Sequence, residues 1–480
     1  MIANRLLTQA PLQIVQAFIG FATLWAFTRL MTPADYGAYT LLVSVSMLAH
    51  TVAFTWAEAA AFRYSTTDDA NAKLKSLAAL RTVAITGAAI VAFIALLGFW
   101  VSGKYGAAIA FTAAAAYLRF LTRLARETER ASQQTSRYVI NELNITIDRF
   151  GIGVFLLRFT QLGVAAPFAG LAIASAILAM RDTPRLLAPA KGAATDLETI
   201  MSFARYGVPL AATLALDLGV QTATRLILAI THGETAAGVY AAAYGLARPL
   251  DLLCIWIGLS AGPVLLEAFR ARRMDRVRAI SQNAFLSLVA IAIPAAAGLA
   301  LVAAPLSEAM IGAGLRDAVS QTLPWLALAG LCNGVALHIF SESFQLTEKT
   351  LWRAALLICA AILQLTLTCI LTPLYGPQGA AIAAAAGAAM TLALFAISSF
   401  RLIGFTPEFS SLAKIACATA AMAYAVMLAP QSGGIGELIV KSAIGACVYA
   451  LVAFVLDIGA ARTKCAALLP AAFRLTQSKA

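Results

Sequence analysis

The sequence is dominated by long apolar stretches joined by short connectors that are charged or contain Pro and Gly. A helix needs about 20 apolar residues to cross the hydrocarbon core of a bilayer, and each stretch is close to that length. None shows the short alternating pattern of a membrane β-strand. We therefore predict an all-α integral membrane protein with about fourteen transmembrane helices. The predicted spans are 12–31, 40–62, 78–101, 105–122, 138–158, 163–181, 203–229, 238–266, 283–304, 320–341, 354–374, 378–400, 412–430 and 438–458.

Composition indicates the same class of protein. Of the 480 residues, 61% are hydrophobic and only 12% are charged, whereas soluble domains carry about 25% charged residues. Mean hydropathy is +0.82. Fourteen spans with short connectors use almost the whole chain, which leaves no room for a soluble catalytic domain. A cytosolic enzyme and a secreted disulfide scaffold are therefore excluded.

The positive charge is explained by membrane topology. The formal net charge is +12, and most of the 35 lysines and arginines fall in alternate connectors. Cytoplasmic loops collect Lys and Arg, so this pattern predicts that both termini are cytoplasmic and that the chain has no nucleic-acid partner. The seven cysteines form no C-x-x-C pair, and Cys465 alone lies in the basic tail. We predict neither disulfides nor a metal site.

The longest connector divides the chain near its middle. Residues 182–202 contain Pro184, Pro189 and Gly192 and are predicted to form a cytoplasmic linker. On this division, residues 1–181 form an N-terminal six-helix lobe and residues 203–400 form a C-terminal six-helix lobe. Residues 401–480 then add helices 13 and 14 and a basic cytoplasmic tail.

A short internal repeat relates the two predicted lobes. Thr-Arg-Leu closes the first span, at 28–30, and occurs again near the end of the seventh span, at 224–226. In both places the next span opens with Gly-x-Tyr, as Gly37 and Tyr39 and as Gly238 and Tyr240. Internal repeats in transporters flank a substrate site at their interface.

Polar side chains recur at helical spacing in spans of both predicted lobes. One such row is Thr213, Asp217 and Gln221. Polar residues are costly in hydrocarbon, so a polar row marks the helix face that avoids lipid. The rows predict one hydrated cavity between the lobes.

Four arginines lie in these polar spans: Arg29, Arg149, Arg225 and Arg248. Arginine is permanently charged and binds phosphate groups through two hydrogen bonds at once. Four such cations in one cavity would suit a phosphate or pyrophosphate group. We predict that they bind the substrate.

Four carboxylates accompany the arginines: Glu58, Asp148, Asp217 and Asp251. They could couple transport to protons or sodium, or they could neutralise the arginines. A local pair such as Arg248 with Asp251, three residues apart, would need no substrate. Of the histidines, His232 falls in an outer loop, and His50 and His338 are isolated in the sequence.

At these residues the chain resembles the Wzx-like bacterial polysaccharide-export flippases of the multidrug/oligosaccharidyl-lipid/polysaccharide (MOP) superfamily. Three stretches carry the resemblance. They are TRLMTPADYGAYTLL (28–42), GVYAAAYGLARPL (238–250) and TPLYGPQGAAIAAAAG (372–387). The last, a Pro-x-Tyr-Gly-x-x-Gly-Ala-Ala turn, is the most specific of the three.

The resemblance implies two six-helix lobes in a V around a central cavity, with helices 13 and 14 appended. It implies a flippase, with no catalytic residues and no cofactor, that moves a polyprenyl-pyrophosphate-linked oligosaccharide across the bacterial inner membrane by alternating access. Arg29, Arg225 and Arg248 match the family's pyrophosphate-binding positions. Arg149 has no such match, and we include it in the predicted site because it lies in a span with a row of polar residues. An acidic residue at Glu58 departs from the family pattern.

Membrane lipids and the polymerase and glycosyltransferases of the same pathway are the implied partners. O-antigen, lipopolysaccharide, capsule and exopolysaccharide pathways would all fit. A cation-coupled multidrug or small-molecule antiporter of the same superfamily is the alternative. A membrane glycan polymerase or ligase is a second alternative, but such enzymes carry a large outer loop that this chain lacks.

Overall fold

The computed structural model describes residues 2–64, 69–101, 103–131, 135–193, 195–460 and 462, and these form helices and connecting turns with no strand among them. Cys465 and the rest of the predicted basic tail lie outside the described residues. The α-helices are α1 (Ile2–Leu30), α2 (Pro33–Tyr64), α3 (Ala70–Val101), α4 (Gly106–Ala131), α5 (Thr135–Phe159), α6 (Ala166–Leu187), α7 (Leu197–Arg270), α8 (Met274–Leu301), α9 (Ala303–Met310), α10 (Arg316–Val335), α11 (Glu342–Leu346), α12 (Thr350–Ile403), α13 (Phe409–Met427) and α14 (Gly434–Val455). Short helical turns are η1 (Gly103–Tyr105), η2 (Gly163–Ala165), η3 (Ala188–Ala190), η4 (Ala313–Leu315), the π-helical η5 (Ala336–Phe340) and η6 (Ile458–Ala460).

Two of these helices each contain two of the predicted spans. Gly233 interrupts α7 with φ 80° and ψ 174°, and Gly376 interrupts α12 with φ 55° and ψ −135°. Glycine tolerates a positive φ because it has no Cβ atom. With α7 and α12 counted as two spans each, and with the short α9 and α11 left aside, the helices reproduce the predicted fourteen-span, all-α fold.

The two halves of α12 pack against each other as an antiparallel hairpin. A Cβ atom on Gly379 would lie 2.2 Å from the carbonyl oxygen of Leu371, and one on Gly387 would lie 2.6 Å from the Cβ atom of Gln364. Both pairs are nearly symmetric about Gly376. Small residues therefore allow the two halves to approach at backbone distance.

The chain forms two compact units, Met1–Ala241 and Ala242–Ala480. The first half of α7 thus belongs with the N-terminal helices, although the predicted boundary was the linker 182–202. Much of that linker is helical, because α6 continues to Leu187, η3 follows it, and α7 begins at Leu197. The assignment of residues to the two six-helix lobes stays a prediction.

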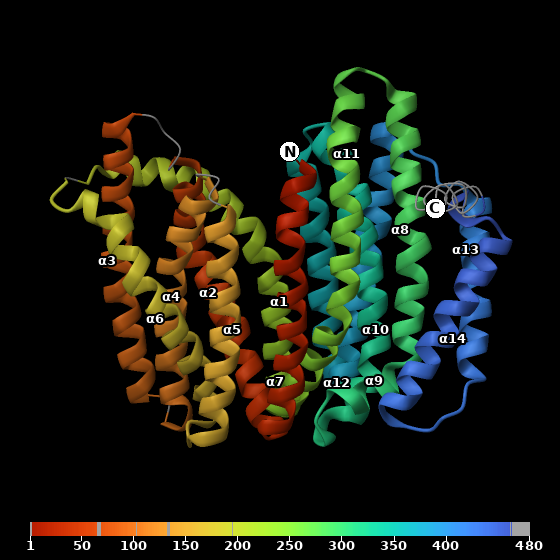
Figure 1. The fold of residues 1–480 in the computed structure, drawn as a ribbon, viewed down its shortest axis with the longest axis horizontal. Coiled ribbons are helices and arrows are strands. Elements are labelled where there is room, and N and C mark those ends of the chain that lie inside the picture. The colour runs from red at the N-terminus through yellow and green to blue at the C-terminus, as the bar shows by residue number, and fades with distance from the viewer. Residues whose placement is uncertain are drawn as a thin grey trace, which may run out of the picture. The chain divides into compact units, whose positions relative to one another are not determined.

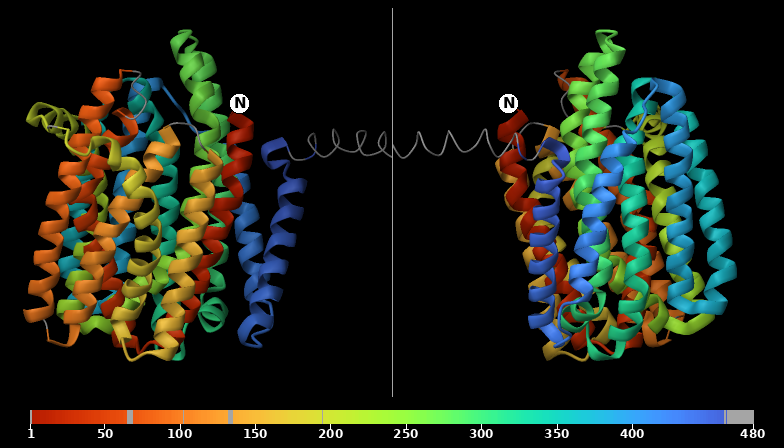
Figure 2. Two further views of the ribbon diagram at one scale, coloured as in Figure 1. Left: turned by 60° about the vertical axis from the view of Figure 1, so that its left-hand side comes forward. Right: turned by 90° about the vertical axis from the view of Figure 1, so that its right-hand side faces the viewer.

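In the first unit, α4 is the central helix. It packs against α2, α3 and α6, while α5 packs against α6 and α1 (Figures 1 and 2). Phe54 of α2 stacks on Phe120 of α4 with ring centroids 4.4 Å apart, inside a buried apolar cluster. This arrangement fixes the face of α4 that meets α2 and α5.

The second unit is built around α10, which packs against α8, α9 and α12. Phe285, Phe340 and Phe405 form an aromatic centre, with edge-on contacts at 5.6 Å from Phe405 to each of the other two rings. α13 and α14 pack as a pair, and α13 also contacts α8. Within α14, the buried Lys441 donates to Glu437 at 2.5 Å, so this span carries its own counter-charge.

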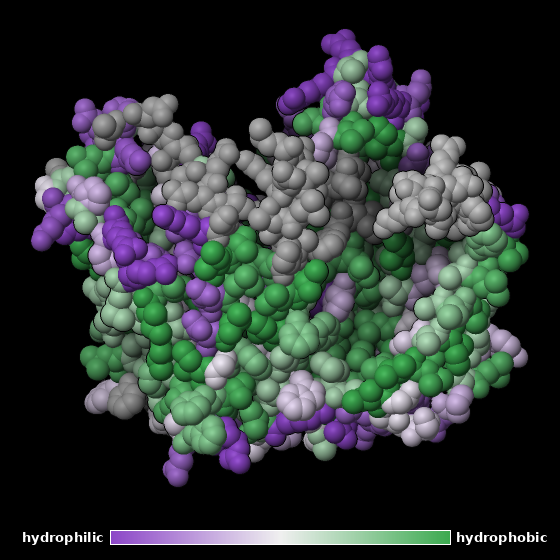
Figure 3. Space-filling model, viewed as in Figure 1, coloured by the Kyte–Doolittle hydropathy of each residue, from purple (hydrophilic) through white to green (hydrophobic). Residues whose placement is uncertain are grey.

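The surface is that of a membrane protein. Among the described residues, ten helical segments are long and apolar enough to cross a bilayer. Large apolar side chains are widely exposed, for example Trp100 at 86% and Leu351 at 87%. In each unit hydrophobic residues cover the middle of the helices, and hydrophilic residues gather toward the helix ends (Figure 3). The chain is a multi-pass membrane protein.

The two copies of the predicted repeat touch each other inside the first unit. A Cβ atom on Gly37, near the start of α2, would lie 1.9 Å from the carbonyl oxygen of Glu234. Nearby, Tyr105 donates a hydrogen bond of 2.8 Å to Oε2 of Glu234. The start of α2 is thus held against the turn at Gly233.

Candidate anion-binding site and charge network

Arg149 lies near the middle of α5, and its side chain is exposed. Its guanidinium interacts electrostatically with Tyr39 of α2 and with Arg119 of α4. Glu142 is the carboxylate in electrostatic range, but Oε1 of Glu142 already accepts from Arg126 at 2.5 Å. No carboxylate among the described residues forms an ion pair with Arg149.

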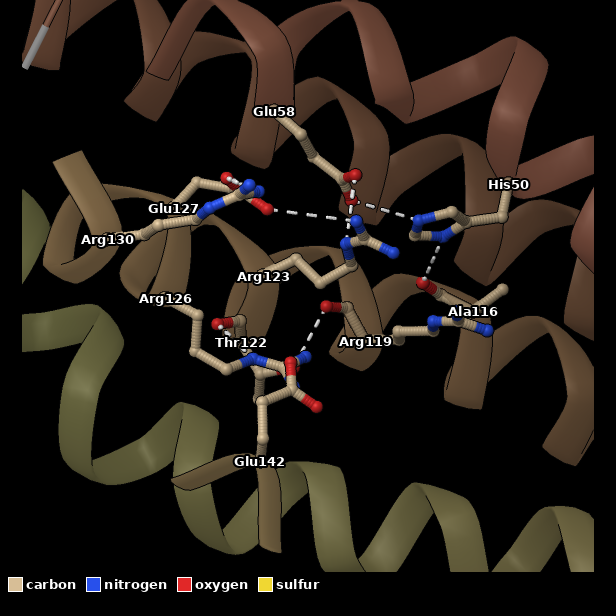
Figure 4. A network of polar contacts seen from close by, with 10 residues as sticks. All are labelled: His50, Glu58, Ala116, Arg119, Thr122, Arg123, Arg126, Glu127, Arg130 and Glu142. Carbon is tan, nitrogen blue, oxygen red and sulfur yellow. Dashed lines mark hydrogen bonds and ion pairs between the residues drawn. The ribbon is translucent and has the colours of Figure 1, made fainter. Parts of the chain in front are cut away.

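Arg119 is a cation of the same region that the sequence analysis did not single out. The predicted span 105–122 ends too early, because α4 continues to Ala131 and places Arg119 at its middle. Figure 4 shows its guanidinium beside the backbone of Ala116, with no bond drawn to a carboxylate. Arg119 on α4 and Arg149 on α5, which form no ion pair among the described residues, therefore lie within electrostatic range of each other.

The remaining arginines on that face of α4 are neutralised. Arg119, Arg123, Arg126 and Arg130 follow one another in steps of four, three and four, which places them on one side of a helix. Arg123 Nε lies 3.1 Å from Oε2 of Glu58, Arg126 pairs with Glu142, and Arg130 Nη1 lies 3.6 Å from Glu127. Arg119 is the member of the row that forms no ion pair among the described residues, although Glu58 lies within electrostatic range of it.

Glu58 is the most buried carboxylate of this network, with a side chain 4% exposed. Its Oε1 atom lies 2.9 Å from Nε2 of His50, and Nδ1 of His50 lies 3.2 Å from the carbonyl oxygen of Ala116 (Figure 4). Both ring nitrogens of His50 therefore lie within hydrogen-bond distance of an acceptor oxygen. His50, isolated in the sequence, is thus part of a charge network.

Arg225 lies on the first half of α7 and is half-buried. Its Nη1 atom donates to the hydroxyl of Ser44 on α2. The hydroxyl of Thr222 lies 3.3 Å from the carbonyl oxygen of Ser44, which strengthens the same junction. Tyr36 and Tyr240, one from each copy of the repeat, interact electrostatically with Arg225.

Arg29 lies at the end of α1, in its last turn, rather than in the middle of a span. Its guanidinium stacks over the ring of Trp25 at 4.7 Å and donates a 3.2 Å bond to the carbonyl oxygen of Trp25. Both side chains are exposed. Arg29 therefore contacts its own helix at the end of α1, whereas Arg149 lies near the middle of α5.

Arg248 and Asp251 belong to the second unit. Arg248 is exposed and Asp251 is half-buried. Although the spacing allows an ion pair, none joins these two described residues. A Cβ atom on Gly330 of α10 would lie 3.6 Å from Oδ1 of Asp251, so this carboxylate faces α10.

The other two predicted carboxylates have few polar contacts. Oδ2 of Asp217 accepts a 2.9 Å hydrogen bond from Gln221, one turn along α7, and the Asp217 side chain is exposed. Asp148 is half-buried beside Arg149 on α5. Of the four predicted carboxylates, Glu58 pairs with an arginine, Arg123, which lies outside the predicted site. Among the described residues, no three His, Cys, Asp or Glu side chains are placed to hold a metal ion.

Comparison with known proteins identifies the family and the fold. A family model described as polysaccharide biosynthesis protein matches residues 26–320. No curated protein sequence matches the chain.

Solved structures with similar folds include lipid II flippase MurJ in its inward closed conformation, with a TM-score of 0.76 and 14% identity over 93% of this chain and 98% of that one. An inward-facing multidrug resistance MATE family transporter of the MOP superfamily follows, with a TM-score of 0.63 and 12% identity over 81% of this chain and 94% of that one. At such low identity these similarities show the fold alone.

The fold agrees with the MOP-type architecture predicted from the sequence, and the matching family model spans well over half of the chain. The chain belongs to the polysaccharide biosynthesis protein family.

Proposed function

We propose that this protein is a flippase that moves a polyprenyl-pyrophosphate-linked oligosaccharide across the bacterial cytoplasmic membrane for surface polysaccharide biosynthesis. It acts as a transporter rather than as an enzyme, and both of its termini are cytoplasmic. The family match and the MOP-type fold support a lipid-linked cargo. The Lys- and Arg-rich connectors support the orientation.

The observation that carries this proposal is the pair Arg119 and Arg149. Both lie in the middle of their helices, within electrostatic range of each other and without an ion-pair partner among the described residues. Two like charges so placed repel each other and are costly in the middle of a bilayer. An anionic cargo removes both costs, and pyrophosphate provides the oxygens that two guanidinium groups can bind.

Arg225 extends the proposed site along α7. Ser44 occupies one of its nitrogens, and the tyrosines of the repeat surround it. Tyrosine hydroxyls can donate to phosphate oxygens, so the cluster suits the same kind of ligand. Arg29 and Arg248 remain proposed contacts on the basis of the family resemblance.

The buried pair of His50 and Glu58 favours a second candidate, a cation-coupled multidrug exporter. A buried acid that exchanges a proton is what such a transporter needs for coupling. The exposed Asp217 on α7 would then receive a cationic drug. This candidate leaves Arg119 and Arg149 without a role.

Binding in nanodiscs separates the two candidates. Purified protein is titrated with farnesyl pyrophosphate, with farnesyl alcohol as the uncharged control, and with a lipophilic cation such as ethidium. A flippase binds the pyrophosphate tightly and loses about tenfold or more in affinity in the Arg119→Ala/Arg149→Ala double variant. Tight ethidium binding with no preference for the pyrophosphate over the alcohol would overturn the proposal.

A further inference from the structure

A shallow pocket outside the charge network opens between α3, α4, α6 and η3 in the first unit. Its volume is about 400 Å³. The residues lining it are Arg81, Leu118, Leu121, Ala179, Met180, Thr183, Pro184, Leu187, Ala188 and Lys191. No role of the proposed flippase uses it.

The lining changes character along α6. Ala179 and Met180, with Leu118 of α4, form an apolar wall toward the middle of the helices. Met180 is 71% exposed, so this wall faces the surface. Thr183 follows about one helical turn later, and Lys191 lies beyond the end of α6. The pocket is therefore apolar at its membrane side and polar where the helix ends.

Two cations lie at the polar end. Nη1 of Arg81 donates a 3.2 Å bond to the carbonyl oxygen of Ala190, which anchors the side chain beside η3. That bond uses one of the five N–H groups of the guanidinium. Lys191 is exposed on the other side of the same turn. Among the described residues, no carboxylate forms an ion pair with either cation.

We propose that this pocket binds one anionic phospholipid of the surrounding bilayer. Its phosphate lies between Arg81 and Lys191, and an acyl chain follows Met180 and Leu118. Basic pockets between transmembrane helices bind anionic lipid headgroups in this way. The site is separate from the proposed cargo site and does not depend on it.

Native mass spectrometry of the detergent-purified protein tests the proposal, with phosphatidylglycerol as the probe and phosphatidylcholine as its zwitterionic control. Phosphatidylglycerol is expected to bind at least tenfold more tightly at one site. Each lost cation should weaken it about fivefold, so the Arg81→Ala/Lys191→Ala double variant loses on the order of 25-fold.

Two further variants keep the test independent of folding and of net charge. Ala188→Trp fills the pocket at an exposed position and leaves both cations in place, so it should abolish the tight site. Arg185→Ala/Arg205→Ala removes two exposed cations that do not line the pocket and should leave affinity within about twofold. Equal affinity for the two lipids, or equal losses in the two charge-deleting double variants, would overturn the proposal.

Discussion

Gly238 approaches Gly37 so closely that a Cβ atom on Gly238 would lie 3.1 Å from the Cα atom of Gly37. The two glycines hold equivalent places in the repeat, each two residues before a tyrosine. The repeat therefore contributes a packing contact in the first unit, where the start of α2 meets the turn of α7. It also gathers Tyr36 and Tyr240 around Arg225.

Gly37→Ala should destabilise the protein by about 2–3 kcal/mol, because its Cβ atom would clash with the backbone carbonyl of Glu234 at 1.9 Å. Thermal unfolding in detergent measures the loss. Gly219→Ala on α7 is the matched control, since its Cβ atom meets nothing within 4 Å. The control should stabilise the helix by up to about 1 kcal/mol. Equal melting temperatures for the two variants would contradict the close approach.

Glu58→Gln should cost about 2 kcal/mol, because it removes the nearer counter-charge of Arg123, leaves only Glu127 at 3.8 Å, and keeps His50 buried beside the site. The loss is below the 3–5 kcal/mol of a fully buried pair, since Arg123 is 36% exposed. The Glu58→Gln/Arg123→Gln double variant should recover part of the stability. A double-mutant cycle with strictly additive losses would show that the pair contributes nothing.

Arg119→Ala and Arg126→Ala should behave in opposite ways, although both remove one cation from the same face of α4. Arg119 forms no ion pair among the described residues, so its loss should leave the melting temperature almost unchanged and weaken farnesyl pyrophosphate binding about tenfold. Arg126 is 6% exposed and pairs with Glu142, so its loss should destabilise the protein by about 3 kcal/mol. Equal binding losses in the two variants would mean that only total charge matters.

The ion pair of Lys441 and Glu437 inside α14 allows a comparison of how much stability is lost when either partner is removed. Glu437 accepts from Lys441 and also from the backbone N–H of Gly433 at 2.8 Å. Lys441→Met leaves Glu437 with that second donor, whereas Glu437→Gln leaves a buried ammonium group without its partner. The melting temperature should therefore fall further in Glu437→Gln. The Glu437→Leu/Lys441→Leu variant should be at least as stable as the wild type, because an apolar pair avoids the cost of desolvation. If Lys441→Met were the less stable single variant, the assigned contacts would be wrong.

The sequence predicts the spans well and the pairing of charges poorly. Hydropathy locates fourteen spans because a helix that crosses the hydrocarbon core needs about 20 apolar residues. It ends the fourth span at residue 122, between Arg119 and Arg123, although arginine is a good helix former and α4 continues to Ala131. Hydropathy therefore places Arg119 near the end of the span instead of the middle of the helix, but the steps of four, three and four along the arginine row could have revealed a continuing helix.

Which arginines are neutralised depends on contacts between helices. Arg123 has one local partner, Glu127, at 3.8 Å, but its nearer partner Glu58 comes from α2. The partner of Arg126, Glu142, comes from α5, and no local sequence pattern reports either of these two pairings. Arg29 matches the family motif, but its contacts with Trp25 are local to the end of α1. Both His50 and Glu58 lie on α2, yet their separation of eight residues is too long for a standard one-turn pair, so sequence spacing left His50 isolated.

The one-residue interruption at Gly376 has a consequence for the order in which the second unit assembles. Gly379 meets Leu371 and Gly387 meets Gln364, so the contacts that close α12 on itself span at most 23 residues. Contacts this local form quickly, since little chain entropy is lost in closing them. The two halves of α12 can therefore pair, starting at the turn at Gly376, as soon as residue 387 has been synthesised. The paired helices then form a surface on which α10 can pack before α13 and α14 have been synthesised.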